Sequence, residues 1–271
     1  MSIGIEFWGV RGTFPSPGQD KIRYGGHTLC ASRRLSSEAV AIIDAGTGIR
    51  PLGDRLMRET SGKDLRVFLF LTHFHLDHII GFPFFAPLYS SRTELTVLAA
   101  NDPEETREIL AGLMKGRTFP LDLDETPCRK TFRKFEEGLE IADVRFSSRP
   151  LRHPQGSTAF RLDAGGASVV MAMDTEHPDA GVDEVLAALA RGADHLVYDA
   201  TYTPEEYNKG KKGWGHSTWL EGTRLARAAG VGHLVLSHWN PDHSDDDVEA
   251  LLESARREFP RTSAAAEGMR L

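Results

Sequence analysis

The sequence has little of what a disulfide scaffold, a zinc finger or a membrane protein needs. Its 271 residues include only two cysteines, Cys30 and Cys128, which match no zinc spacing and no disulfide framework. No apolar run approaches the roughly 18 residues of a membrane span. The first residues contain neither a basic segment nor a long apolar one. We therefore expect a soluble, cytoplasmic protein without a membrane partner, whose thiols are buried or free.

Basic charge is also scarce. The 32 lysine and arginine residues are outnumbered by 39 aspartate and glutamate residues, which gives a formal net charge of −7. This balance provides no overall basic field for a long polyanion, so nucleic acid is disfavoured as a partner but not excluded. The 40% hydrophobic content is sufficient for a large core, and we expect one domain over residues 1–271.

What the sequence does have is a concentration of histidine and aspartate after one apolar run. Residues 65–71 have the length and composition of a buried strand, and His73, His75, Asp77 and His78 follow within a few positions. Imidazole and carboxylate without thiolate favour an open, hydrolytic metal site over a closed structural one. The alternative is a loop that is histidine-rich by chance, which would crowd costly polar groups beside a core strand.

The pattern His-x-His-x-Asp-His resembles the metallo-β-lactamase-fold hydrolases. This resemblance implies an α/β fold, a four-layer αββα sandwich of two mixed β-sheets flanked by helices. It also implies two divalent metal ions, with Zn²⁺ as the first expectation and Mn²⁺ or iron as alternatives. By resemblance, the first ion is held by His73, His75 and His153, the second by Asp77, His78 and His238, and Asp174 bridges the two.

Three residues before the histidine cluster are candidates for supporting roles. Asp44 ends an apolar strand near residues 39–44, and by resemblance it holds the metal loop or a ligand histidine by hydrogen bonds. Its alternative role is to cap a helix over residues 48–60. In the Gly/Pro-rich loop further upstream, Arg11 and His27 are candidate contacts for an anionic substrate, with solvated loop residues as the alternative.

Periodicity and turn residues outline the remaining elements. The turn Gly165-Gly166 predicts a hairpin between residues 158–163 and 167–173. Further strands are expected at 3–9, 28–35, 94–99, 131–136, 139–147, 194–197 and 233–236. Further helices are expected at 103–114, 183–191, 217–229 and 244–259. We expect a loose tail over 261–271, and segment 115–130 has no clear assignment beyond a lid or a dimer contact.

Two later features narrow the resemblance to the phosphodiesterase branch of the family, which includes ribonuclease Z. Asp199 ends a strand before Ala-Thr, and the stretch Gly-His-Ser-Thr at His216 opens a helix, with Thr218 as a candidate substrate contact. That branch usually has glutamate where this chain has the shorter Asp199, which puts its reach to His216 in doubt. The chain has Trp239-Asn240 where ribonuclease Z includes a phosphate-binding arginine, and it lacks an insertion like the arm that grips transfer RNA.

The implied reaction is hydrolysis of a small phosphodiester, with a cyclic nucleotide as the leading substrate. Two cations roughly 3.5–4 Å apart clamp a phosphate and make hydroxide available from a bridging water. Asp77 would orient that hydroxide, and His216, held by Asp199, would protonate the leaving oxygen. The alternative for His216 is a structural hydrogen bond at a helix start. The alternative functions are ribonuclease Z-like processing of RNA 3′ ends, which a homodimer could support, thioester or lactone hydrolysis, and a di-iron redox sensor.

Overall fold

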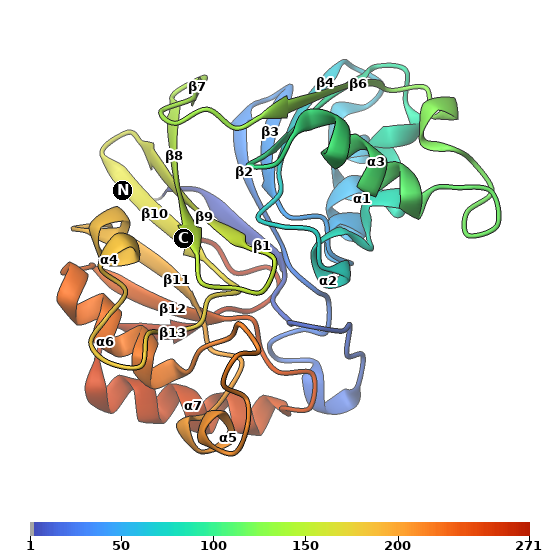
Figure 1. The fold of residues 1–271 in the computed structure, drawn as a ribbon. Coiled ribbons are helices and arrows are strands. Elements are labelled where there is room, and N and C mark those ends of the chain that lie inside the picture. Colours follow the sequence, from blue (N-terminus) through green and yellow to red (C-terminus); the bar gives the residue numbers. More distant parts are fainter. Residues whose placement is uncertain (1–2) are drawn as a thin grey trace.

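A computed structural model describes residues 3–271, in which two β-sheets pack face to face with helices outside them (Figure 1). Within these residues, the first sheet has six strands in the order β1-β2-β3-β4-β5-β6, and the second has seven in the order β13-β12-β11-β10-β9-β8-β7. Both sheets are mixed, because β3 to β6 and β10 to β13 run parallel and the other neighbours run antiparallel. The predicted αββα sandwich is confirmed.

The elements have the following bounds. The first sheet consists of β1 (Ile5–Gly9), β2 (Cys30–Ser36), β3 (Ala39–Ile43), β4 (Leu65–Phe70), β5 (Thr93–Ala99) and β6 (Arg129–Lys134). The second consists of β7 (Glu140–Ile141), β8 (Val144–Leu151), β9 (Ser157–Ala164), β10 (Ala167–Ala172), β11 (His195–Asp199), β12 (His233–Ser237) and β13 (Thr262–Ala264). The helices are α1 (Ile49–Thr60), α2 (Leu76–Ile79), α3 (Pro103–Leu113), α4 (Glu184–Ala190), α5 (Pro204–Asn208), α6 (Trp219–Ala229) and α7 (Asp245–Glu258). Among residues 3–271, no helix combines the length and the apolar character that crossing a membrane requires.

Strand β3 shows how the two sheets generate two cores. Its five residues are all buried, although successive side chains of a strand point to opposite faces. Ala41 and Ile43 belong to the core between the sheets, whereas Val40 and Ile42 belong to the core under α1 and α3. A strand covered on both faces therefore reads as a continuous apolar run.

The helices cover the outer faces of the sheets, α1 and α3 on the first and α4, α6 and α7 on the second (Figure 1). Their ends follow the predicted signals. Asp102 accepts hydrogen bonds from two backbone amides of α3, with Pro103 in the first turn. Ser244 caps α7 by accepting from the Asp247 amide, and Gly230 ends α6 with a left-handed φ of 64°.

Aromatic rings join the two sheets below the histidine cluster. Phe70 of β4 stacks on Phe146 of β8 with ring centroids 4.4 Å apart, and it meets Phe160 of β9 edge-on at 5.6 Å. All three side chains are fully buried. Because β4 leads directly into the cluster, this contact fixes the position of the cluster relative to the second sheet.

The prediction of a loose tail over 261–271 is wrong. Residues Thr262–Ala264 form β13 beside β12, and the chain then returns to β1. The Phe7 amide donates to the Met269 carbonyl at 3.0 Å, and the Leu271 amide donates to the Ile5 carbonyl at 2.9 Å. These partners are more than 260 positions away in sequence, so local composition carried no sign of them.

Two further boundaries differ from the sequence-based expectations. The strand expected at 139–147 is divided into β7 and β8 by a tight turn in which Ala142 has a φ of 55°. Strand β8 also continues to Leu151, close to His153. In segment 115–130, Leu123 and Cys128 are buried, and β6 begins at Arg129. A lid or dimer contact for that segment stays a prediction.

We predict that Phe146→Ala lowers the free energy of unfolding by about 3–5 kcal/mol, because it removes a buried ring that packs against Phe70. Chemical denaturation of the purified variant measures this loss. The control is Val185→Ala on exposed surface of α4, which should stay within about 0.5 kcal/mol of the parent chain. Equal losses in both variants would contradict the proposed role of the ring stack.

Candidate metal centre

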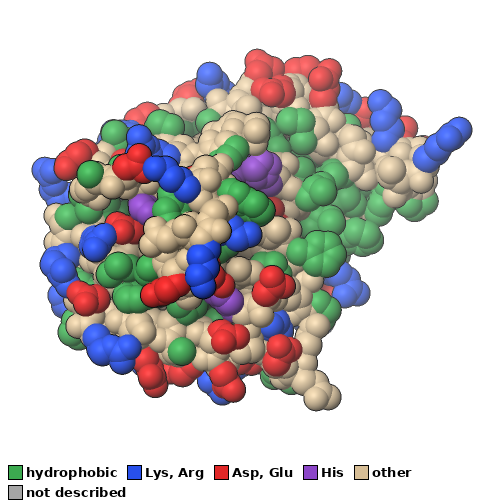
Figure 2. All heavy atoms as spheres, turned by 60° about the horizontal axis from the view of Figure 1, so that its bottom comes forward, with side chains coloured by type: hydrophobic (Ala, Val, Ile, Leu, Met, Phe, Trp, Pro, Cys, Tyr) green, Lys and Arg blue, Asp and Glu red, His purple; other side chains and the backbone are tan. Residues whose placement is uncertain are grey.

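The structure places the predicted ligands at one edge of the two sheets. His73 follows β4, Asp174 follows β10 and His238 follows β12, and the carboxyl ends of parallel strands share an edge. His153 enters from the turn after β8. Figure 2 shows histidine side chains at the surface of the face that it presents, beside an area of hydrophobic side chains. Among the described residues, ligand atoms within 4.8 Å of one another form three groups. Two of them hold all seven predicted ligands and are called the ligand groups below: His73, His75, His153 and Asp174, and Asp77, His78, Asp174 and His238. The third consists of Asp199, His216 and His238.

The carboxylate of Asp174 belongs to both groups. Its Oδ1 lies 3.0 Å from Nε2 of His78 and 3.0 Å from Nε2 of His238. Its Oδ2 lies 3.6 Å from Nε2 of His73 and 3.7 Å from Nε2 of His153. Each oxygen therefore faces a different group, which is the arrangement that a bridging carboxylate requires.

The residues present fit divalent cations. Asp174 Oδ1 and the Nε2 atoms of His73, His78 and His238 are buried and have no hydrogen-bond partner within residues 3–271. Buried polar atoms are normally paired, and here they face one another instead. Imidazole nitrogens and carboxylate oxygens are ligands for zinc, manganese and iron. The cluster is thus compatible with a binuclear site.

Asp44 lies behind the cluster. Its carboxylate is fully buried and accepts hydrogen bonds from His78 Nδ1 at 2.8 Å and from the Thr72 amide at 2.9 Å. The alternative role as a helix cap is wrong, because α1 begins after Gly48 without any side-chain cap. Asp44 instead fixes the ring of His78 with Nε2 toward Asp174.

Two further imidazoles are oriented from behind. His153 Nδ1 donates to the Gly215 carbonyl at 2.8 Å. His238 Nδ1 donates to Thr201 Oγ1 at 2.8 Å, and this hydroxyl donates to Asp199 at 2.7 Å. Such partners set which ring nitrogen carries the proton, so Nε2 is left free to bind a cation.

The backbone is strained where three strands reach the site. Asp44, Asp174 and His238 have φ values of 60°, 56° and 61°, in the left-handed region that residues other than glycine rarely adopt. Each such residue costs roughly 1–3 kcal/mol, and such strain persists mainly at functional sites. The three residues lie at or near the ends of β3, β10 and β12, so the strain turns the chain abruptly at the site.

Two glycines let neighbouring loops approach the imidazoles. A Cβ atom on Gly12 would lie 2.2 Å from the ring of His238, and one on Gly215 would lie 2.3 Å from Nδ1 of His153. Gly215 also has a φ of 83°. Any side chain at these positions would displace a predicted ligand.

The electrostatics of the cluster favour ionised carboxylates. Burial disfavours charge on both Asp174 and His78, but their attraction outweighs it, which lowers the pKa of Asp174 and raises the pKa of His78. Burial together with the neighbouring imidazoles lowers the pKa of His73 to about 2. At neutral pH and without a metal ion, the cluster therefore holds ionised carboxylates, a neutral His73 and a protonated His78, so binding of a cation would release the His78 proton.

His216 and Asp199 form a pair beside the ligand groups. His216 Nδ1 lies 2.9 Å from Asp199 Oδ2, so the shorter aspartate side chain does reach the histidine. The ring of His216 stacks on that of His238 with centroids 4.9 Å apart. Burial opposes ionisation of Asp199, but the charge and hydrogen bond of His216 lower its pKa overall. Asp199 thus accepts the Nδ1 proton of His216.

The expectation that Arg11 contacts the substrate is not supported. Its side chain is 0% exposed, and its guanidinium donates to the carbonyls of Gly25, Asn240 and His243. It also faces Asp245 at 3.8 Å. Arg11 therefore joins the N-terminal loop to the segment before α7, and its charge is not available to an anionic ligand.

His27 belongs to none of the ligand groups found among the described residues. Its Nδ1 lies 3.1 Å from Thr47 Oγ1, and it lines a pocket with Pro15 and Glu267. Among the described residues, none of the seven predicted ligands lines that pocket. A contact between His27 and a substrate at the metal centre is therefore not supported.

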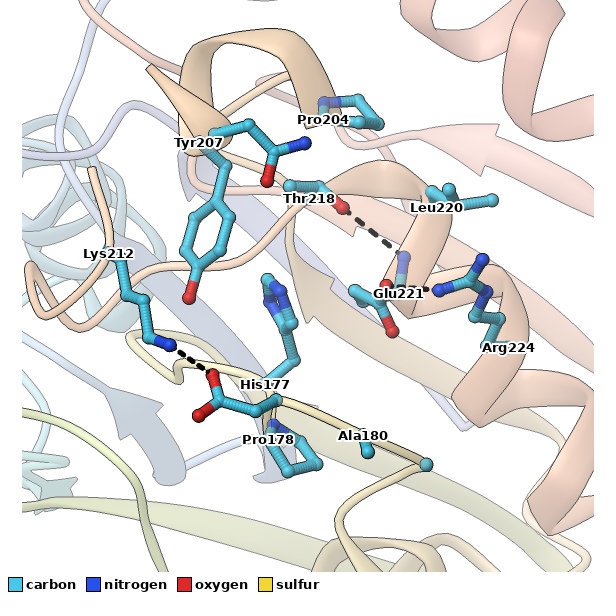
Figure 3. A pocket seen from close by; sticks show the side chains of 13 residues that line it. His177, Pro178, Ala180, Pro204, Tyr207, Lys212, Thr218, Leu220, Glu221 and Arg224 are labelled. Atoms are coloured by element: carbon cyan, nitrogen blue, oxygen red, sulfur yellow. Dashed lines mark hydrogen bonds and ion pairs between the residues drawn. The ribbon is translucent and has the colours of Figure 1, made fainter. Parts of the chain in front are cut away.

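Thr218 caps α6. Its buried hydroxyl accepts a hydrogen bond from the Glu221 amide at 3.3 Å, so it caps the helix, and a substrate contact of Thr218 stays a prediction. It borders the pocket shown in Figure 3, where His177 and Tyr207 also lie. Nδ1 of His177 is hydrogen-bonded to Oγ of Ser217 at 2.9 Å, and His177 belongs to neither ligand group.

Sequence reasoning missed two contacts that hold the site. Glu176 accepts hydrogen bonds from the amides of Gly213 at 2.7 Å and Gly215 at 2.9 Å. The Thr13 amide donates to Asp77 Oδ2 at 2.7 Å. Glu176 lies two positions after Asp174, and this position is the one local sign of its role. The contact of Thr13 joins residues 64 positions apart, and no local feature of the sequence indicates it.

Comparisons with known proteins identify the family. The model of the beta-lactamase superfamily domain matches residues 41–239. The chain belongs to this superfamily. Ribonuclease Z of Pseudomonas putida is 29% identical over 258 residues, covering 76% of each chain. Ribonuclease Z of Methanothermobacter thermautotrophicus is 26% identical, covering 96% of this chain and 94% of the relative. The metallo-beta-lactamase fold protein YhfI from Bacillus subtilis has the same fold, with a TM-score of 0.72, 20% identity, and coverage of 98% and 96% of the two chains.

This superfamily member is a ribonuclease Z-like, metal-dependent hydrolase. The predicted resemblance, fold class and hydrolase activity are therefore confirmed. The identity of the metal ions and the roles of individual ligands stay predictions.

We predict two metal ions per chain, measured by elemental mass spectrometry after metal loading. Asp174→Ala or His75→Ala should lose metal and abolish hydrolysis, because each removes a ligand. Asp64→Ala, an exposed carboxylate away from the centre, is the control and should keep both ions. A stoichiometry of one, or full activity in Asp174→Ala, would contradict the two-metal site.

Proposed function

We propose that this superfamily member hydrolyses small phosphodiesters, with cyclic nucleotides as the substrate class. The observation that carries the proposal is the pair of His216 and Asp199, which stands against the ligand groups at His238. A metal centre alone suits many hydrolytic reactions. A positioned imidazole beside it adds a proton donor for an alkoxide leaving group, which a phosphodiester produces.

The ligand residues would hold the metal ions in two sets. His73, His75 and His153 would hold one, Asp77, His78 and His238 would hold the other, and Asp174 would be shared. When bound, two divalent cations supply charge neutralisation at the phosphate and activation of water at neutral pH. Zn²⁺ is the first candidate, with Mn²⁺ and iron as alternatives.

Asp77 is proposed to orient the attacking water. Burial opposes ionisation of Asp77, but attraction to the His78 and His238 imidazoles, 3.4 Å and 3.5 Å from Oδ2, outweighs burial and lowers the pKa of Asp77. The Thr13 amide fixes one carboxylate oxygen. An ionised, fixed carboxylate accepts a hydrogen bond from water and thereby sets the direction of attack.

His216 is proposed to protonate the leaving oxygen. Because Asp199 accepts from Nδ1, the proton available for transfer is the one on Nε2. Asp199 is itself held by the amide and hydroxyl of Thr201, at 3.0 Å and 2.7 Å. The imidazole is thus positioned before the substrate arrives.

Two observations support a small substrate. The net charge is −7, which gives a long polyanion no general attraction. The residue after His238 is Trp239, which is fully buried with its indole donating to the Ala265 carbonyl at 3.0 Å. No cationic side chain follows the final histidine directly.

Processing of RNA 3′ ends is the second candidate. It is favoured by the relatives named Ribonuclease Z, which align over 76% and 96% of this chain. A homodimer would support it, because a partner subunit could supply the surface for a long RNA. The hydrolase relatives give no support to the di-iron redox sensor.

We predict that 3′,5′-cyclic AMP or another small cyclic phosphodiester is cleaved with a higher kcat/KM than precursor transfer RNA. Side-by-side assays of the metal-loaded protein measure this ranking, and Asp174→Ala serves as the blank for contaminating nucleases. Cleavage of precursor transfer RNA at its 3′ end with the higher kcat/KM would replace the first candidate with the second.

We also predict that His216→Ala lowers kcat by about 10²–10⁴ while both metals stay bound, because it removes the general acid. The defect should shrink with a nitrophenyl phosphodiester, whose leaving group needs little protonation. Asp199→Ala should show a smaller loss in the same direction. An equal defect on good and poor leaving groups would show that His216 binds phosphate or supports the fold instead.

A further inference from the structure

Trp214 stands two residues before His216 and is 56% exposed. It lies in the loop between α5 and α6, flanked by Gly213 and Gly215. A single exposed aromatic side chain is ordinary on a protein surface. Trp214 differs in two respects: the backbone on both sides of it is held by hydrogen bonds, and the ammonium of Lys211 lies over its ring.

The loop is fixed on both sides of Trp214. One oxygen of Glu176 accepts from the Gly213 amide and the other from the Gly215 amide, at 2.7 Å and 2.9 Å. The Gly215 carbonyl then accepts from His153 at 2.8 Å. Glu176 thus holds the backbone on both sides of Trp214, and Gly215 links this backbone to the predicted ligand His153.

A second set of contacts holds the loop from behind. Lys212 forms an ion pair with Asp179 at 2.6 Å, drawn as a dashed line in Figure 3. Tyr207, which lies in the same view, donates to Glu176 at 2.6 Å. The indole of Trp214 is therefore presented on a rigid loop, which lowers the entropic cost of binding a ligand there.

Aromatic and cationic groups connect Trp214 to His216. The ammonium of Lys211 lies 3.9 Å from the centroid of the Trp214 ring and 5.5 Å from that of Tyr202. The ring of Tyr202 in turn meets that of His216 edge-on at 6.0 Å. The Lys211 ammonium thus covers one face of the indole, and the partly exposed ring borders the side of the centre where His216 stands.

We propose that Trp214 is the platform on which the base of a nucleotide substrate stacks, against the face of the indole that Lys211 does not cover. This inference rests on the proposed function, in which His216 protonates the leaving oxygen of the nucleoside. Stacking on an aromatic ring suits any nucleobase, since every base has a π face. The ammonium of Lys211 adds a positive charge that is complementary to the phosphate.

The test measures binding of AMP and of ribose 5-phosphate to the metal-loaded protein by calorimetry. The two ligands carry the same phosphate and ribose, and only AMP has a base. The parent chain should bind AMP more tightly. Trp214→Ala should weaken AMP binding by about 5- to 150-fold and leave ribose 5-phosphate unchanged. Trp214→Phe should retain most of the AMP affinity.

Phe84→Ala is the matched control, because Phe84 is an aromatic side chain with the same exposed fraction, 56%. It lies in the short helical segment Phe82–Phe84, which follows α2. It should bind both ligands as the parent does. Equal affinity of the parent chain for the two ligands, or an equal loss of both in Trp214→Ala, would overturn the platform.

Hydrolysis of cyclic AMP separates this inference from the proposed function. A base-dependent, Trp214-dependent affinity for AMP without hydrolysis of any phosphodiester would reject the proposed reaction and keep the platform. Hydrolysis of cyclic AMP with an unchanged KM in Trp214→Ala would reject the platform and keep the reaction.

Discussion

The rest of the structure depends on keeping one buried carboxylate, that of Asp174, ionised among imidazoles from both sheets. Its two oxygens lie 3.0 Å from His78 and His238 and 3.6–3.7 Å from His73 and His153. Buried charge is tolerated only where partners compensate it, so neither sheet can shift there without exposing an uncompensated group. The left-handed backbone at Asp44, Asp174 and His238 and the stack of Phe70 on Phe146 both help to hold these side chains in position. The ligand cluster therefore also holds the two sheets together.

Parts of this arrangement were predictable because their signals are local. The cluster from His73 to His78 follows a strand of obvious apolar character, and Gly165-Gly166 marks a tight hairpin. The position of Asp199 beside His216 followed from the family pattern, and the geometry removes the doubt about the shorter side chain.

Other parts depend on contacts that no short stretch can indicate. Arg11 resembles a solvated loop cation until residues near 240 cover it, 229 positions further along the chain. Thr218 looks like a site residue because it follows His216, and its hydroxyl also caps α6. Glu176 belongs to no motif, and its role follows only from the hydrogen bonds that the distant Gly213 and Gly215 amides donate to it in the folded chain. These errors concern which residues contact one another across the fold, whereas helices and strands follow from local patterns. The fold was therefore easier to predict than the contacts of the site residues.

The return of the C-terminal segment to β1 has a consequence for the topology of the chain. The Gly4 amide donates to the Leu271 carbonyl at 2.8 Å, so positions 4 and 271 are neighbours. The described chain is therefore almost a closed ring, with the first strand held by the last residues. Joining the two positions by a short linker and opening the ring at an exposed turn, such as the one at Gly116, would leave the pairing of both sheets intact.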